Sequence, residues 1–139
     1  MKTLAIILLI AASSLLSAQT PPPTRTYSGG IVDSNCHRNG QGPVIKNSPG
    51  TIITIHAGGV SSNYLYLLLF NKATAPLNGD VPAIAIPVIQ VDPQVSLGSA
   101  DRDYPGGLPM TTGISWALST SPTRLVTVCV SMTLTVTYQ

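Results

Sequence analysis

The sequence predicts an all-β fold, namely a single antiparallel β-sandwich of about eight strands, jelly-roll or immunoglobulin-like. Apolar residues recur at every second position and not at every third and fourth, which is the spacing of strands. Gly or Pro interrupts the chain every ten residues or so, as expected for short strands joined by turns. A chain of 139 residues has the length of one domain.

The last stretch of the chain, from Arg124 to Gln139, carries the longest alternation. β-branched residues dominate it, and one face is apolar while the other is mostly threonine. We therefore expect one long strand with one side on the core and one side in water. The apolar side comprises Val126, Val128, Val130, Met132, Leu134, Val136 and Tyr138.

The first eighteen residues differ in character from the rest. Lys2 gives a short positive start, Leu4 to Ala12 is an unbroken apolar run, and small residues lead up to Ala18. This pattern is typical of a secretory signal peptide cleaved after Ala18. The run is shorter than the roughly 20 residues that a membrane span needs, so we expect a secreted protein with no stable span. A retained anchor is the alternative.

Residues 19–26 predict a stiff linker, because three consecutive prolines at 21–23 favour an extended chain that no sheet interior accepts. The sandwich domain is then expected at 27–139. It should begin with a weak strand at 27–32 and a polar loop at 33–42. A short edge strand at 43–46 follows and ends in a turn rich in Asn, Pro and Gly.

The middle of the domain alternates more clearly. Residues 51–57 should place Ile53 and Ile55 inward and His56 outward. Residues 64–70 are apolar at every position, as expected of a central strand covered on both faces. A long turn region follows at 71–82.

The later elements are less regular. Residues 83–89 form a strand that Pro87 restricts to a sheet edge or a bulge. Residues 99–112 are expected to be the longest irregular segment. The strand at 114–118 should place Trp116 in the core, and Ser121 with Pro122 turns the chain into the last strand.

The charge content is low. The chain has no Glu and only five acidic residues, and without Lys2 it retains six Lys and Arg. No basic cluster is present, so the sequence gives no sign of nucleic-acid binding. A surface built from Thr, Ser, Asn, Gln and Gly suits extracellular modules and packed assemblies.

Two cysteines, Cys36 and Cys129, are present. In an exported chain such a pair is expected to form a disulfide. Closing so long a loop is worth about 4 to 5 kcal/mol in the chain-entropy account. Two unpaired cysteines are the alternative.

Three segments resemble a family of small β modules that is common in bacteriophage genomes. They are Asn63–Pro76, which ends in Asn-Lys-Ala-Thr-Ala-Pro, Val81–Pro87 and Gly107–Leu118. The resemblance covers about residues 50–138 and implies a virion-associated structural or decoration protein without catalytic residues. The leader and the two cysteines depart from that pattern and favour an exported relative.

Catalytic and metal sites find little support in the sequence. Ser115 lies in a motif one residue short of a nucleophile elbow, and a strand runs on where the elbow needs a helix. Cys36, His37 and His56 are too few and too irregularly spaced for structural zinc. We expect no catalytic residue, no metal site and no cofactor.

The best candidate binding loop comprises Asp101, Arg102, Asp103 and Tyr104, followed by Pro-Gly-Gly. Asp101 and Asp103 could share one side of the loop, as in calcium sites, or could simply cap backbone amides. Tyr104 could stack on a sugar ring or a partner, or lie back on its own domain.

These observations favour a non-enzymatic structural subunit that acts through packing against itself or other structural proteins, on a virion surface or as an exported fibre-forming protein. The alternative is an extracellular carbohydrate-binding or adhesion module that uses the 99–112 loop for a surface glycan.

Overall fold

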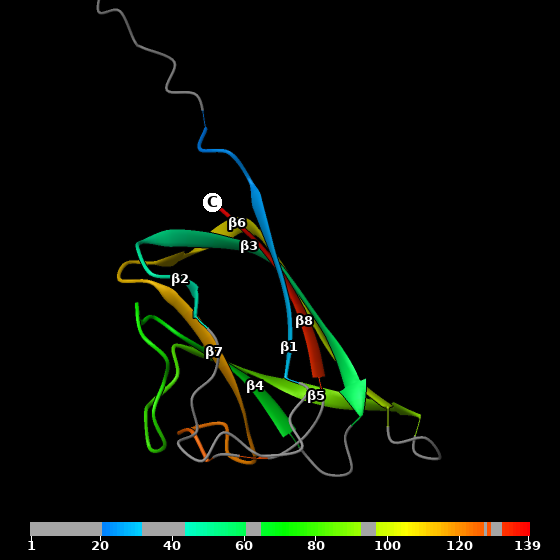
Figure 1. Ribbon diagram of the computed structural model, residues 1–139. Helices are drawn as coiled ribbons and strands as arrows, with labels where there is room; N and C mark the ends of the chain where they lie inside the picture. The colour runs from blue at the N-terminus through cyan, green and yellow to red at the C-terminus, as the bar shows by residue number, and fades with distance from the viewer. Residues whose placement is uncertain (1–20, 32–43, 61–64, 93–96, 127, 129–131) are drawn as a thin grey trace, which may run out of the picture.

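The computed structural model describes residues 21–31, 44–60, 65–92, 97–126, 128 and 132–139, and this part of the chain forms eight β-strands (Figure 1). The strands are β1 (Arg25–Ile31), β2 (Val44–Lys46), β3 (Gly50–Val60), β4 (Leu65–Phe70), β5 (Ile84–Asp92), β6 (Leu97–Met110), β7 (Ile114–Ser119) and β8 (Met132–Tyr138). The predicted all-β class and strand number are confirmed.

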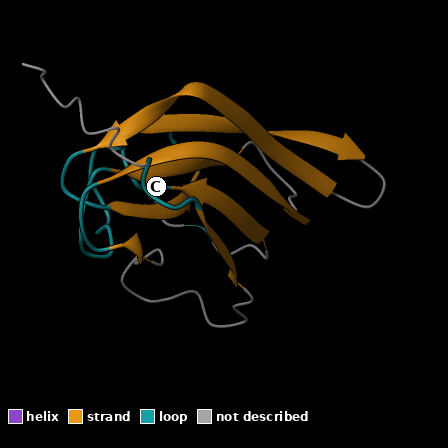
Figure 2. Cartoon of the chain, turned by 90° about the horizontal axis from the view of Figure 1, so that it is seen from above, coloured by secondary structure: helices purple, strands orange, loops and turns teal. Residues whose placement is uncertain are grey.

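The strands form two four-stranded antiparallel sheets, consistent with the predicted sandwich (Figure 2). The first sheet has the order β1-β8-β3-β6 and the second has the order β5-β4-β7-β2. β5 joins them, because its first half pairs with β4 and its last residues pair with the beginning of β6. Within the described residues, no helix has the length and hydropathy that crossing a bilayer requires.

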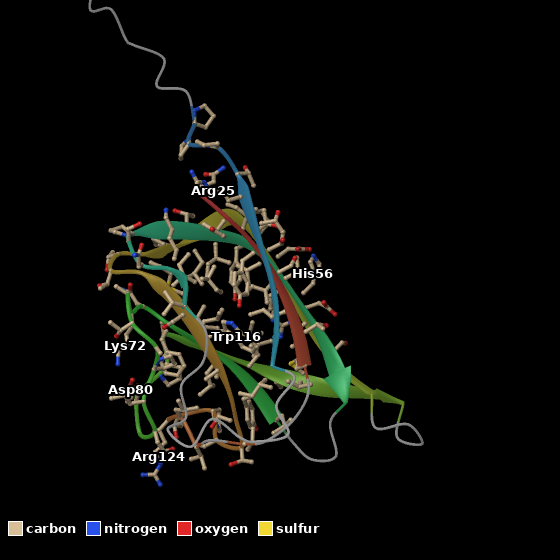
Figure 3. The ribbon with its side chains drawn as sticks, viewed as in Figure 1. Arg25, His56, Lys72, Asp80, Trp116 and Arg124 are labelled. Atoms are coloured by element: carbon tan, nitrogen blue, oxygen red, sulfur yellow. The ribbon has the colours of Figure 1, made fainter. Side chains whose placement is uncertain are left out.

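The main core lies between the two sheets and has Trp116 at its centre (Figure 3). Trp116 is fully buried, as its alternation with Ile114 and Leu118 predicts. The first sheet contributes every second residue of β8, which confirms that part of the predicted apolar face. These residues are Met132, Leu134 and Val136.

The outer face of the second sheet is covered too. Leu68 and Phe70 of β4 form a second buried cluster with Ala117 and Leu125. The loop that carries Leu125 is fastened there by backbone hydrogen bonds from Leu125 to Asp80 and from Gly79 to Leu125, both 2.8 Å long. The prediction that the apolar strand is covered on both faces is therefore confirmed.

The inward residues of β3 differ from the prediction. Ile52 and Ile55 are fully buried, whereas Ile53 is only half-buried. Ile53 is an extra residue between the pairs that Ile52 and Thr54 form with β8, so it is the site of a β-bulge. The bulge shifts the alternation by one position, which is why the assignment of Ile53 to the core is wrong.

The last strand is shorter than predicted, since it begins at Met132 and not at Arg124. Leu125 and Val126 lie outside any strand. Leu125 bonds to the 79–80 turn and buries its side chain in the second cluster, so local packing replaces the strand pairing that the alternation favours.

Several predictions concern residues outside the described ranges. Cys36, His37, Cys129 and the first eighteen residues are among them, so the disulfide and the leader stay predictions. Two residues of the predicted linker are described as strand, because β1 begins at Arg25. Pro87 lies in the half of β5 that pairs with β4 alone among the described residues, in line with an edge position.

Candidate functional site

Most of the predicted binding loop at 99–112 is strand, since β6 runs to Met110, so the loop assignment is wrong. Residues Leu97 to Asp103 of β6 pair in register with β3, from Val60 to Thr54. Backbone pairing overrides the weak local propensity of a segment rich in Asp, Gly and Pro. The stretch is therefore fixed to the sheet and is not a hinged loop.

One irregularity interrupts β6 within this stretch. The residues Tyr104 to Gly107 stand opposite the single residue Ile53, between the pairs of Asp103 with Thr54 and of Leu108 with Ile52. Gly107 has a φ of +72°, and a Cβ there would lie 2.4 Å from Cγ2 of Thr51. Only glycine meets both conditions, so Gly107 closes a fixed bulge.

Tyr104 packs against the main core from this bulge. Its burial raises the pKa of the phenol, and the nearby charge of Arg102 acts in the opposite direction. Of the two alternatives that the sequence left open, the structure supports a tyrosine that lies back on its own domain.

Asp101 and Asp103 share the outer face of the first sheet, as period-two alternation requires, and Arg102 lies on the other face. Asp101 is paired in register with His56, and its Oδ1 lies 3.1 Å from Nδ1 of His56. Both side chains are more than half exposed, at 57% for His56 and 55% for Asp101. Figure 3 shows His56 pointing away from the sandwich, as predicted.

This outer face is polar across all four strands. In one cross-strand row, Ser28 of β1 is followed by Thr135, His56 and Asp101. The neighbouring row is made of hydroxyl groups and one carboxylate. It comprises Thr26, Thr137, Thr54 and Asp103.

The turn that begins at Asn71, one of the segments on which the predicted resemblance rests, has a structural role. Asn71 accepts a hydrogen bond from the backbone N–H of Thr112 at 2.8 Å and donates one to Oγ1 of Thr111 at 2.9 Å. Lys72 pairs with Asp80, which also accepts from the backbone N–H of Leu77 at 2.7 Å (Figure 3). The Asn71 bonds hold the start of the 71–83 turn against the β6–β7 connection, and the Asp80 contacts close the turn on itself.

Ser115 does not have the exposed position that a nucleophile needs. Its side chain is fully buried, and its Oγ finds no hydrogen-bond partner among the described residues. Ser115 lies on the face of β7 opposite Trp116, and this face is covered. No three His, Cys, Asp or Glu side chains of the described residues are grouped as a metal site would require.

An open hollow of about 540 Å³ lies at one end of the sandwich and is lined by Arg25, Lys46 and Tyr138 among others. Nζ of Lys46 lies 5.9 Å from the centre of the Tyr138 ring and donates to the carbonyl of Gln139 at 3.1 Å. The lining is shared between polar and apolar groups, and the ammonium group of Lys46 already has these two partners within the chain.

Strand edges are the remaining candidate surfaces, because an edge presents unpaired backbone groups to another chain. Within the described part of the chain, β6 beyond Ala100 pairs only with β3, and β2 pairs only with β7. The β6 edge carries three charges, the bulge and two prolines, the free half of β5 carries Pro87, and β2 has three residues. Each of these features discourages further pairing.

β1 forms the opposite edge of the first sheet and has none of these protections. Its seven residues pair with β8 without any shift in register. It contains no proline, and its single charge is Arg25 at the first position. β1 runs beside β8 in Figure 1, and among the described strands it pairs with β8 alone. Sequence reasoning missed this surface, although the Pro-free, nearly uncharged run at 25–31 is a readable signal.

Comparison with known proteins gives no further lead, since neither any family model nor any curated protein sequence matches the chain.

Proposed function

We propose that this protein is a non-enzymatic structural β-sandwich that acts through protein–protein packing. Its setting would be an exported surface or fibre-forming protein, or a decoration-like subunit on a virion surface. The observation that carries this proposal is the edge of β1, which is regular and unprotected while the other described edges are blocked. A buried Ser115 and an outer face of the first sheet made largely of Thr and Ser also fit a packing role better than a catalytic one.

The proposal is tested by expressing the full-length coding sequence and measuring the mass of the recovered protein by size exclusion with light scattering. Negative-stain microscopy of the same sample distinguishes closed oligomers from filaments. We expect species larger than one chain at concentrations of about 100 μM, since interfaces of a single strand pair are small and weak. A strict monomer at such concentrations, alone and with candidate structural partners, would contradict the proposal.

Mass spectrometry of the same sample under non-reducing conditions tests the two remaining sequence predictions. Loss of residues 1–18 is the expected result for a signal peptide, and a mass lower by two hydrogens is expected for the disulfide between Cys36 and Cys129. An intact leader or two free thiols would remove the corresponding prediction.

A second candidate function is carbohydrate binding, and one observation favours it. His56, Asp101 and Asp103 lie together on the exposed outer face, flanked by threonine hydroxyls. Carboxylate, imidazole and hydroxyl groups are suited to sugar hydroxyls. This version uses the sheet face, because the 99–112 loop on which the sequence hypothesis relied is a strand.

A glycan array tests this second candidate with wild type and the Asp101→Asn variant. Binding by wild type that the variant loses would support it, with Thr74→Ala as a control in an exposed turn. Absence of binding by wild type would contradict it.

A further inference from the structure

The edge of β1 is complementary to itself when two copies of the strand run antiparallel. The strand spans Arg25–Ile31, so Ser28 is its central residue. If the two-fold axis passes through Ser28, this residue faces Ser28 of the second copy, and Arg25 faces Ile31 of the second copy. No charge then faces a like charge. Like charges that face each other would oppose edge pairing.

The same register brings an aromatic residue opposite a glycine. Tyr27 of one copy faces Gly29 of the other, and the reverse pair follows from the symmetry. In the single chain the Tyr27 ring lies over Gly29 of its own strand, since a Cβ at Gly29 would lie 2.1 Å from the Tyr27 hydroxyl oxygen. Tyr27 also packs against the main core. An aromatic side chain that covers a glycine compensates for its missing side chain, within a strand or across two.

The free backbone N–H and C=O groups of β1 can form a hydrogen-bonded ladder in this register, whichever residues of β1 point them away from β8. Successive residues of an edge strand point their N–H and C=O groups alternately toward the neighbouring strand and away from it. An antiparallel pair centred on one residue closes its ladder whether that residue or its two neighbours point outward. The register thus does not depend on which set of groups bonds to β8.

We propose that two copies of this chain pair antiparallel through β1 around Ser28, forming a two-fold dimer in which the two first sheets merge into one continuous sheet. This inference rests on the proposed packing function and names its partner and contact surface. A two-fold contact of this kind is closed, and it uses the same strand from both copies. Further growth into a fibre would need a second contact elsewhere.

Charge substitutions at Ser28 test the register. Ser28 is exposed on the outer face, so neither Ser28→Lys nor Ser28→Asp disturbs the core. In the dimer each variant places two like charges face to face at the axis, and we expect the dissociation constant to rise at least about tenfold. An equimolar mixture of the two variants places opposite charges there and should associate again. Thr74→Lys, in an exposed turn, is the matched control.

Sedimentation equilibrium over a concentration series on the full-length expression products gives the readout, and far-UV circular dichroism with thermal unfolding confirms that each variant is folded. Dimerisation of wild type, its loss in both single variants and its recovery in the mixture support the proposal. Association of wild type that both variants retain overturns the β1 dimer and leaves the packing function standing. Monomers at all concentrations overturn both.

Ser28→Cys provides a second, independent measurement. Residues directly opposite in an antiparallel pair have Cα atoms about 4.5 to 5.5 Å apart, within the range that a disulfide bridges. Oxidation at concentrations that favour association should give a covalent dimer, and Thr74→Cys should not. Equal cross-linking of both variants would overturn the assignment of the axis to Ser28.

Discussion

Gly113 lies so close to the 71–73 turn that no side chain fits in place of its hydrogen. A Cβ there would lie 2.6 Å from Cα of Ala73 and 2.8 Å from the carbonyl oxygen of Lys72. The close approach of two backbones is the physical reason for glycine at this position, because no positive φ is found at Gly113.

The change Gly113→Ala should therefore lower the free energy of unfolding by about 2 to 3 kcal/mol, since backbone atoms cannot move aside as side chains can. Gly106→Ala is the matched control, because nothing lies within 4 Å of a Cβ at Gly106 and its φ is not positive. Urea denaturation measures both. Equal effects of the two changes would contradict the packing of the 71–73 turn described above.

The ion pair between Lys72 and Asp80 predicts a pH dependence of stability. The hydrogen bond from Lys72 lowers the pKa of Asp80 below its ordinary value of 3.8, and the backbone N–H of Leu77 acts in the same direction. The folded state thus holds the proton less tightly than the unfolded state. The stabilisation is present above about pH 4 and is lost as the pH falls through the lowered pKa.

Asp80→Asn should accordingly be less stable than wild type at pH 7, and the difference should vanish below the lowered pKa, where the carboxyl group is protonated in both states. Lys72→Gln should remove most of the same dependence, since it deletes the main cause of the shift. Denaturation at pH 7, 4 and 2.5 measures this. A difference between wild type and Asp80→Asn that stays constant over this range would show that the pair does not contribute.

At the scale of elements, the alternation of apolar and polar residues predicts a strand well where that strand pairs regularly with its neighbouring strands. Trp116 and its neighbours on β7, His56 on β3 and the apolar residues of β8 from Met132 lie as the pattern requires. The unbroken apolar run of β4 also predicts correctly that both of its faces are buried. These positions are predictable because burial depends on the side chain itself.

The pattern fails where long-range pairing or local packing prevails over it. β6 is polar and rich in Gly and Pro, and it is a strand because β3 pairs with it over its length. The bulge at Ile53 moves the core face by one residue, and a single sequence holds no sign of that shift. The predicted binding loop has the wrong backbone, since Asp101 to Tyr104 belong to a strand. Asp101 and Asp103 share its outer face, whereas Tyr104 packs against the core.

Leu125 lies between β7 and β8, where the sequence predicts a strand, and its side chain contributes to the stability of the second sheet. It is 1% exposed and covers Leu68, Phe70 and Ala117 on the outer face of the second sheet. Leu125→Ala should lower the free energy of unfolding by about 2 to 4 kcal/mol because it leaves a cavity. Leu77→Ala is the control of the same chemistry, since Leu77 is 50% exposed and should cost less than about 0.5 kcal/mol. Similar losses for both would contradict the second cluster.

At the scale of the whole molecule, the two sheets differ on their outer faces. Loops cover β4 and β7 of the second sheet, whereas the first sheet presents rows of Thr, Ser, His and Asp. The edges also differ, since prolines and bulges interrupt β6 and β5, whereas β1 has neither and carries a charge only at its first residue, Arg25. These differences are the basis for proposing that copies associate through one edge of the first sheet, next to its polar outer face.

Amide hydrogen exchange of residues 25–31, measured by mass spectrometry at about 1 μM and about 200 μM, tests this claim most directly. Outward-pointing amides of an edge strand exchange rapidly unless another strand pairs with them. The account predicts slower exchange in 25–31 at the higher concentration and unchanged exchange in the 104–107 bulge of β6. Exchange in 25–31 that does not depend on concentration, or protection that appears at 104–107 instead, would contradict it.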